Sequence, residues 1–115
     1  MSGNAADTHV LERLFAMVES RKDADAASSY TAKLLSEGRA RIAQKLGEEA
    51  IEAAIAAVAA GDEDVRRAVT RESADLLYHL LVLWAACGVA PADVWAELAA
   101  REGESGLEEK ARRGG

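Results

Sequence analysis

Residues 39–87 read RARIAQKLGEEAIEAAIAAVAAGDEDVRRAVTRESADLLYHLLVLWAAC, and this stretch decides the fold. It contains two long helical patterns, residues 39–60 and 63–87, in which apolar side chains recur at steps of three and four. Gly61 is suited to end the first helix and Asp62 to cap the second. A connection of only two residues leaves room for nothing but an antiparallel neighbour. The sequence therefore predicts a helical hairpin.

Three shorter helical patterns flank the hairpin, at residues 9–22, 30–37 and 91–101. Ser29 is suited to cap the second of these patterns. Pro91 can occupy the first turn of the third, where its missing N–H costs no hydrogen bond. We therefore expect an all-α fold of four to five helices, with the hairpin as its core.

The composition agrees with helices. Half of the residues are hydrophobic but only 4% are aromatic, and 26 of the 115 residues are alanine. This mixture suits closely packed helices better than sheets. We expect one domain over residues 9–101, preceded by a flexible N-terminus (1–8) and followed by a charged, mobile tail (102–115).

Charge and hydropathy argue against several classes of protein. The formal net charge of -6 disfavours general binding to nucleic acid. The longest stretch without a charged residue, 76–92, is shorter than the roughly 20 residues that cross a bilayer. The N-terminus has no basic cluster before an apolar block, as a secretory signal would. The single cysteine, Cys87, cannot form an internal disulfide, which fits a reducing compartment. We expect a cytoplasmic protein that binds neither nucleic acid nor membrane.

Acidic residues line one edge of each helix of the hairpin. Glu48, Glu49 and Glu52 lie where the apolar stripe of the first helix meets solvent. Glu72 and Asp75 lie at i and i+3 on the second helix, at a matching distance from the turn of on the order of 15 to 20 Å. Five carboxylates at one height repel each other unless cations neutralise them. The sequence therefore predicts a metal site, and ligands that are all oxygen favour Mg²⁺ first and Mn²⁺ second.

Each candidate residue also has a simpler explanation. A run of charges on a helix is usually a solvated face. Lys45 can form a helical ion pair with Glu49 or bind a phosphate. Lys33 belongs to a loose basic group that solvation alone explains, although an anionic substrate needs such a counter-charge. His79 follows Asp75 by one turn, so it can orient that carboxylate behind the metal or simply be a histidine at the edge of the core.

The second hairpin helix is apolar on more than one side. Tyr78, Leu81 and Val82 lie away from its main apolar stripe. A chain of 115 residues has little material for a second layer of helices. We therefore predict that a second copy covers this side, which completes a helical bundle in a homodimer.

Four segments together resemble the phosphoribosyl-ATP pyrophosphohydrolase family, and the likeness covers most of the chain. They are SYTAKLL (29–35), KLGEEAIE (45–52), ESADLLYHLLVL (72–83) and DVWAELAAR (93–101). The pattern Glu-Glu-x-x-Glu followed on the next helix by Glu-x-x-Asp is typical of the wider superfamily of all-α, MazG-type nucleoside triphosphate pyrophosphatases.

The resemblance implies that the chain hydrolyses phosphoribosyl-ATP between its α and β phosphates, giving phosphoribosyl-AMP and pyrophosphate, the second step of histidine biosynthesis. It implies that five acids bind magnesium and that Glu48, Glu49 and Glu52 are catalytic, with Glu48 as a ligand or as the base that orients the water. Lys33 and Lys45 would contact phosphate oxygens. The metal ligands would be Glu48, Glu49, Glu52, Glu72 and Asp75, with His79 behind them.

Two other functions remain open at this stage. A house-cleaning pyrophosphatase of MazG type, acting on ordinary or damaged nucleotides, would use the same acids. A noncatalytic helical dimer that docks a partner protein would carry them only for solubility.

Overall fold

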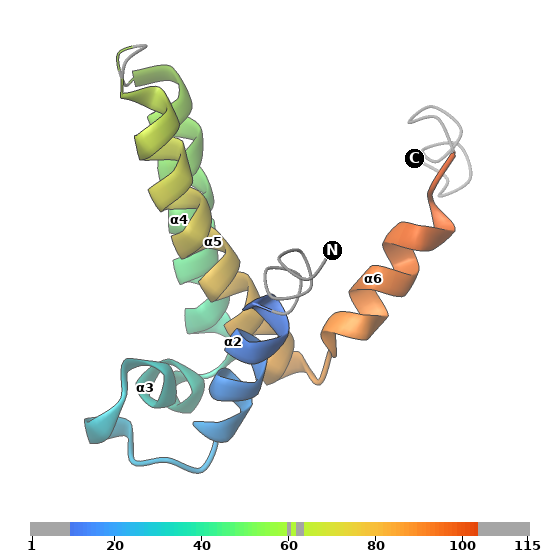
Figure 1. Ribbon diagram of the computed structural model, residues 1–115. Coiled ribbons are helices and arrows are strands. Elements are labelled where there is room, and N and C mark those ends of the chain that lie inside the picture. The colour runs from blue at the N-terminus through green and yellow to red at the C-terminus, as the bar shows by residue number, and fades with distance from the viewer. Residues whose placement is uncertain (1–9, 60, 62–63, 104–115) are drawn as a thin grey trace.

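A helical hairpin dominates the computed structural model, which describes residues 10–59, 61 and 64–103 (Figure 1). The predicted hairpin is confirmed: α4 (Arg39–Ala59) and α5 (Val65–Cys87) run antiparallel and make the most extensive contact between helices. The carbonyl of Gly61 accepts hydrogen bonds from the N–H groups of Asp64 and Val65, each at 2.9 Å. The predicted cap Asp62, and the predicted start of the second helix at residue 63, lie outside the described residues.

Three further α-helices and one 3-10 turn complete the described chain: α2 (Val10–Ser20), η1 (Ala26–Ser28), α3 (Tyr30–Glu37) and α6 (Pro91–Ala100). The predicted cap of α3 is confirmed, because Ser29 Oγ accepts a hydrogen bond from the N–H of Ala32 at 3.2 Å. Gly38 and Gly88 end α3 and α5 with φ of 94° and 74°, values that favour glycine. The short turn η1 was not predicted. Of the two terminal segments that we expected to be mobile, 1–8 and 102–115, only residues 102 and 103 are among the described residues.

The buried core lies at the end of the hairpin remote from Gly61, where α2 and α3 pack against α4 and α5 (Figure 1). Its centre consists of Val18, Leu34, Ile42, Val82 and Ala85. The half of the hairpin nearer the turn has no such cover, and Ile51, Ile55 and Val58 on α4 are 61%, 53% and 84% exposed.

One prediction about packing is wrong. Leu81 and Val82 are both 0% exposed within a single chain, so a second copy is not needed to cover them. Val82 belongs to the core that α5 shares with α2, α3 and α4, and Tyr78 packs against that core. The reason is that helical periodicity shows which residues share a face, but not which helix packs on it.

α6 leaves the body of the molecule, because α5 and α6 meet at a bend of 105° (Figure 1). Trp84 and Trp95 contact edge to face across this bend, and Trp95 Nε1 donates a hydrogen bond to Glu12 Oε2 of α2 at 2.9 Å. Among the described helices, none is by itself long and apolar enough to cross a membrane, and only the bent pair α5 and α6 taken together reaches such a composition.

Candidate active site

Three carboxylates from the two hairpin helices meet at one point. Glu49 of α4 and Glu72 and Asp75 of α5 each have an oxygen within 4.8 Å of the others. Glu49 lies on the stripe of α4 that faces α5 and is only 9% exposed, whereas Asp75 is exposed to solvent. We call Glu49, Glu72 and Asp75 the carboxylate cluster. The hairpin thus brings together acids that are more than twenty residues apart in the sequence.

Among the described residues, Glu72 lies near three other carboxylates and only one cation that acts on it, Arg71. The Oε1 atom of Glu72 is buried and has no hydrogen-bond partner. The pKa of the Glu72 carboxyl is raised, first because burial penalises its charged form and then because Glu52, Asp75 and Glu49 repel it; only Arg71 acts in the opposite direction. A buried carboxylate oxygen without a donor, next to other carboxylates, fits a bound hard cation, since oxygen ligands suit Mg²⁺ and Mn²⁺.

The other two predicted metal ligands lie beside the cluster rather than in it. Glu52 is exposed, and its charge is the largest electrostatic influence on Glu72. Glu48 points toward its own helix: Oε1 accepts from Lys45 Nζ at 3.1 Å and Oε2 from Gln44 Nε2 at 3.2 Å. Lys45 thereby lowers the pKa of Glu48, which keeps that carboxylate ionised at the edge of the site.

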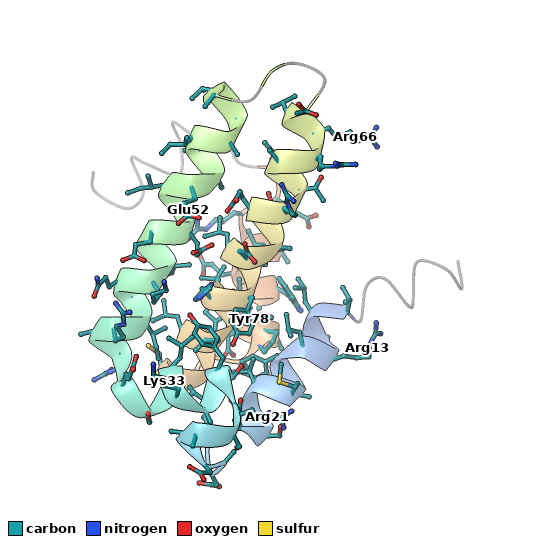
Figure 2. The ribbon with its side chains drawn as sticks, turned by 90° about the vertical axis from the view of Figure 1, so that its left-hand side faces the viewer. Arg13, Arg21, Lys33, Glu52, Arg66 and Tyr78 are labelled. Carbon is teal, nitrogen blue, oxygen red and sulfur yellow. The ribbon has the colours of Figure 1, made fainter. Side chains whose placement is uncertain are left out.

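The two predicted phosphate ligands are placed differently. Lys45 pairs with Glu48 and not with Glu49 as the simpler explanation had it, because Glu49 is turned inward to the carboxylate cluster. The ion pair with Glu48, and Tyr30 nearby, raise the pKa of Lys45. Lys33 lies on α3 near the end of the hairpin remote from the turn, far below Glu52 in Figure 2, and its Nζ is 3.9 Å from Glu37 Oε2.

His79 is buried, at 6% exposure, behind the cluster. Its Nδ1 donates to the backbone carbonyl of Asp75 at 2.8 Å. His79 therefore contacts the main chain of Asp75 rather than its carboxylate, and its role behind a bound metal stays a prediction. Its Nε2 lies 3.5 Å from Tyr30 Oη, which connects α3 to the same turn of α5.

Sequence reasoning missed the aromatic cluster around His79. The rings of Tyr30 and Tyr78 stack with centroids 6.3 Å apart, and Tyr78 meets His79 edge to face at 5.0 Å. Tyr78 also hydrogen-bonds to Thr31, which is 5% exposed. The signal was present, because Tyr30 and Thr31 belong to SYTAKLL, one of the segments that carry the family resemblance.

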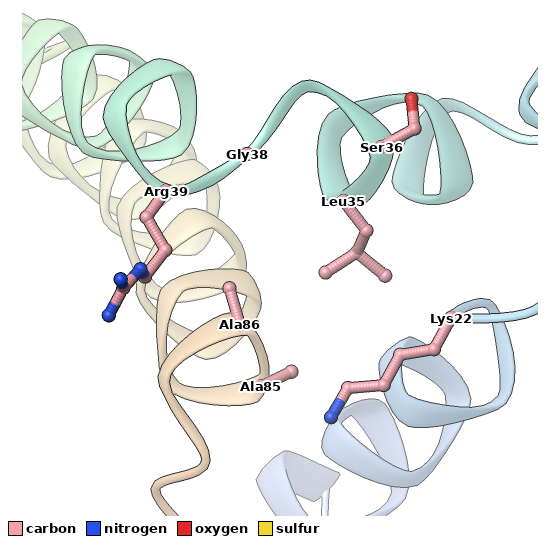
Figure 3. Close-up of a pocket in the computed structure, with 7 residues that line it drawn as sticks. All are labelled: Lys22, Leu35, Ser36, Gly38, Arg39, Ala85 and Ala86. Carbon is pink, nitrogen blue, oxygen red and sulfur yellow. The ribbon is translucent and has the colours of Figure 1, made fainter.

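A separate hollow of about 380 Å³ opens at the foot of the hairpin, among the ends of α2, α3 and α5 and the start of α4 (Figure 3). Lys22 and Arg39 border it, and no residue of the carboxylate cluster does. Lys22 Nζ is paired with Glu19 Oε1 at 3.2 Å. This hollow is not part of the acidic site.

Comparison with known proteins identifies a family for this chain. A family model described as phosphoribosyl-ATP pyrophosphohydrolase matches residues 11–102. The protein named phosphoribosyl-ATP pyrophosphatase of Parvibaculum lavamentivorans is 62% identical over 96% of this chain and 97% of its own length. Proteins of the same name from Paramagnetospirillum magneticum and Azospirillum brasilense are each 55% identical, over 95% and 98% of this chain and 96% and 98% of their own lengths.

Proposed function

Because the chain belongs to the phosphoribosyl-ATP pyrophosphohydrolase family, we propose that it hydrolyses phosphoribosyl-ATP to phosphoribosyl-AMP and pyrophosphate, the second step of histidine biosynthesis. The observation that carries this proposal is the carboxylate cluster, with its buried and unpartnered oxygen on Glu72. A site of this kind suits a substrate that reaches the protein as a complex of a triphosphate with a divalent cation.

Glu49, Glu72 and Asp75 would hold Mg²⁺, for which Mn²⁺ is the substitute, and Glu52 would join them from the exposed edge. When bound, such an ion offsets charge on the triphosphate and lowers the pKa of a coordinated water. Glu49 and Glu72 come from different helices, so the packing of the two hairpin helices would determine the distance between these ligands.

Glu48 and Lys45 would act on the reacting groups. Glu48 is held ionised by Lys45, so it can accept a proton from the water that attacks the α phosphorus. The bond between the α phosphorus and the bridging oxygen breaks, and pyrophosphate leaves with the electron pair of that bond. Lys45 Nζ, 3.1 Å from Glu48, would contact a phosphate oxygen and neutralise charge as the bond breaks. Lys33 would contact phosphate only if its long, exposed side chain leaves Glu37.

Turnover by purified protein tests this function. Wild type should cleave phosphoribosyl-ATP faster than dCTP or dUTP, and faster cleavage of the simple nucleotides would favour the house-cleaning pyrophosphatase. Glu49→Gln should reduce turnover by about a hundredfold or more, because a metal ligand matters at least as much as the groups that orient it. Glu19→Gln on α2, where the carboxylate pairs with Lys22 at the surface, is the matched control. A Glu49→Gln protein with normal turnover and a normal circular dichroism spectrum would refute the assignment.

A homodimer is supported by a different face from the one that the sequence indicated. Opposite the side of the hairpin that carries Glu52 and Asp75, small and apolar side chains of both helices are exposed or half-buried: Ala50, Ala54, Ala57, Leu76, Leu77 and Leu80. Small residues let another helix approach closely, and Ile51, Ile55 and Val58 extend the apolar surface. A second copy is the occupant we propose. A single-chain mass in sedimentation equilibrium at micromolar concentration would contradict it.

The cytoplasmic location that the sequence predicts stays a prediction.

A further inference from the structure

The first two turns of α5 carry three arginines that pair with no described carboxylate. Within the described residues, no carboxylate lies within ion-pair distance of Arg66, Arg67 or Arg71, and all three are exposed. Several basic side chains elsewhere are paired: Lys22 with Glu19, Lys33 and Arg41 with Glu37, Lys45 with Glu48, and Arg101 with Glu97. Three neighbouring guanidinium groups repel each other, and a bound anion would relieve that repulsion.

These arginines border a shallow, open hollow on the surface of α5. Together with Thr70 they line a space of about 390 Å³. The hydroxyl of Thr70 donates to the backbone carbonyl of Arg66 at 2.7 Å. Thr70 therefore has no proton left to offer a ligand, and the guanidinium groups supply the donors. A phosphate suits this set, because the planar guanidinium can donate two parallel hydrogen bonds to it.

One row of residues on α5 connects the arginines of the hollow with Asp75 of the carboxylate cluster. Arg67, Arg71 and Asp75 follow each other at i, i+4 and i+8, so they share a face of the helix. Arg71 and Asp75 do not pair, since Asp75 is turned to Glu49 and Glu72. Arg67 lies about 12 Å from Asp75 along the axis at the usual helical rise. The row therefore leads from acids that suit a cation to arginines that suit an anion.

We propose that Arg67 and Arg71, with Arg66 at the border, bind the phosphate of the phosphoribosyl group of the substrate. This inference rests on the proposed function. Phosphoribosyl-ATP is anionic at both ends. The triphosphate goes with its cation to the carboxylate cluster, and the far phosphate needs a separate set of cations. Ordinary nucleoside triphosphates lack that second phosphate, so the arginine hollow would distinguish the two kinds of substrate.

The test compares variants on two substrates: phosphoribosyl-ATP and the same molecule after removal of the phosphoribosyl phosphate. Arg67→Gln and Arg71→Gln should each raise KM for phosphoribosyl-ATP about tenfold or more, with kcat little changed, because a charge-assisted hydrogen bond is lost in both ground and transition states. For the dephosphorylated substrate, wild type should already have the high KM and the variants should not raise it further. Arg21→Gln, in the turn that follows α2 (Figure 2), is the matched control and should behave as wild type, because the Arg21 guanidinium bonds only to Ser20 among the described residues.

Three outcomes would overturn the inference: an unchanged KM in both variants, an equal rise for both substrates, or a fall in kcat alone. An equal rise would mean that the arginines bind the triphosphate. Circular dichroism and the melting temperature check that the exposed substitutions leave the fold intact. If wild type fails to cleave phosphoribosyl-ATP, the proposed function fails. Calorimetric titration with ribose 5-phosphate then tests the hollow separately: weaker binding to Arg71→Gln than to wild type supports the site, and no binding to wild type refutes it.

Discussion

Replacing Leu81 by alanine tests whether one chain buries the middle of α5. Leu81 is 0% exposed within a single chain, so the change removes fully buried carbon atoms. Their lost transfer free energy is about 2 kcal/mol, and the cavity that remains raises the total loss to about 3 to 4 kcal/mol. For a domain of this size, such a loss lowers the melting temperature by about 12 to 16 °C.

The assay is urea unfolding followed by circular dichroism at two protein concentrations about tenfold apart, together with sedimentation. Leu81→Ala should lower the midpoint at both concentrations and leave the oligomeric state unchanged. Ile55→Ala is the matched variant, because Ile55 is 53% exposed in one chain; it should weaken self-association instead. A Leu81→Ala protein whose unfolding free energy falls by less than about 1 kcal/mol but which dissociates into single chains would refute the reasoning. Leu81 would then lie in the contact between two copies.

Three further predictions concern the site and its supports. The pKa of Glu72 is raised above its ordinary 4.5 in the folded chain, so the folded protein binds more protons than the unfolded one. The unfolding free energy in EDTA should therefore fall as the pH rises from 4.5 through the raised pKa, which unfolding in urea across pH measures. Mg²⁺ or Glu72→Gln should remove this fall. Ser29→Ala removes the cap of α3 and should cost about 1 kcal/mol, measured as a lower melting temperature; an unchanged value would contradict the role of the cap. Lys45→Gln removes the cation that holds the pKa of Glu48 down, so the acidic limb of the pH profile of kcat/KM should move to higher pH. An equal fall in activity at every pH would contradict this effect of Lys45 on the pKa of Glu48.

The hairpin and the meeting of its acids could be predicted because both depend on distance along the chain. A short connection fixes the direction of the second helix, and a constant rise per residue fixes the height of Glu49 and Glu72. The structure confirms that acids from both helices meet, with three of the predicted five in the cluster.

The sequence could not show which of several residues or helices at similar distances a side chain contacts. Lys45 can reach Glu48 or Glu49 by helical spacing alone, and the packing of Glu49 against α5 decides for Glu48. In the same way, periodicity shows that Leu81 and Val82 of α5 need a cover but not that the same chain provides it, as their 0% exposure in one chain shows. These outcomes depend on rotamers and on the order in which helices pack, and neither has a periodic signature.

The end of the hairpin nearer Gly61 has one further consequence, for motion. Beyond the level of Glu49 and Glu72, neither α2 nor α3 braces the two helices, so their amide protons should exchange with solvent through local opening that leaves the core closed. Repulsion within the carboxylate cluster favours the same opening. A cation bound between the helices would hold them together, and the amide protons between the cluster and Gly61 would then exchange more slowly. The residues that prepare the chemistry would thus also set how often this end of the molecule opens.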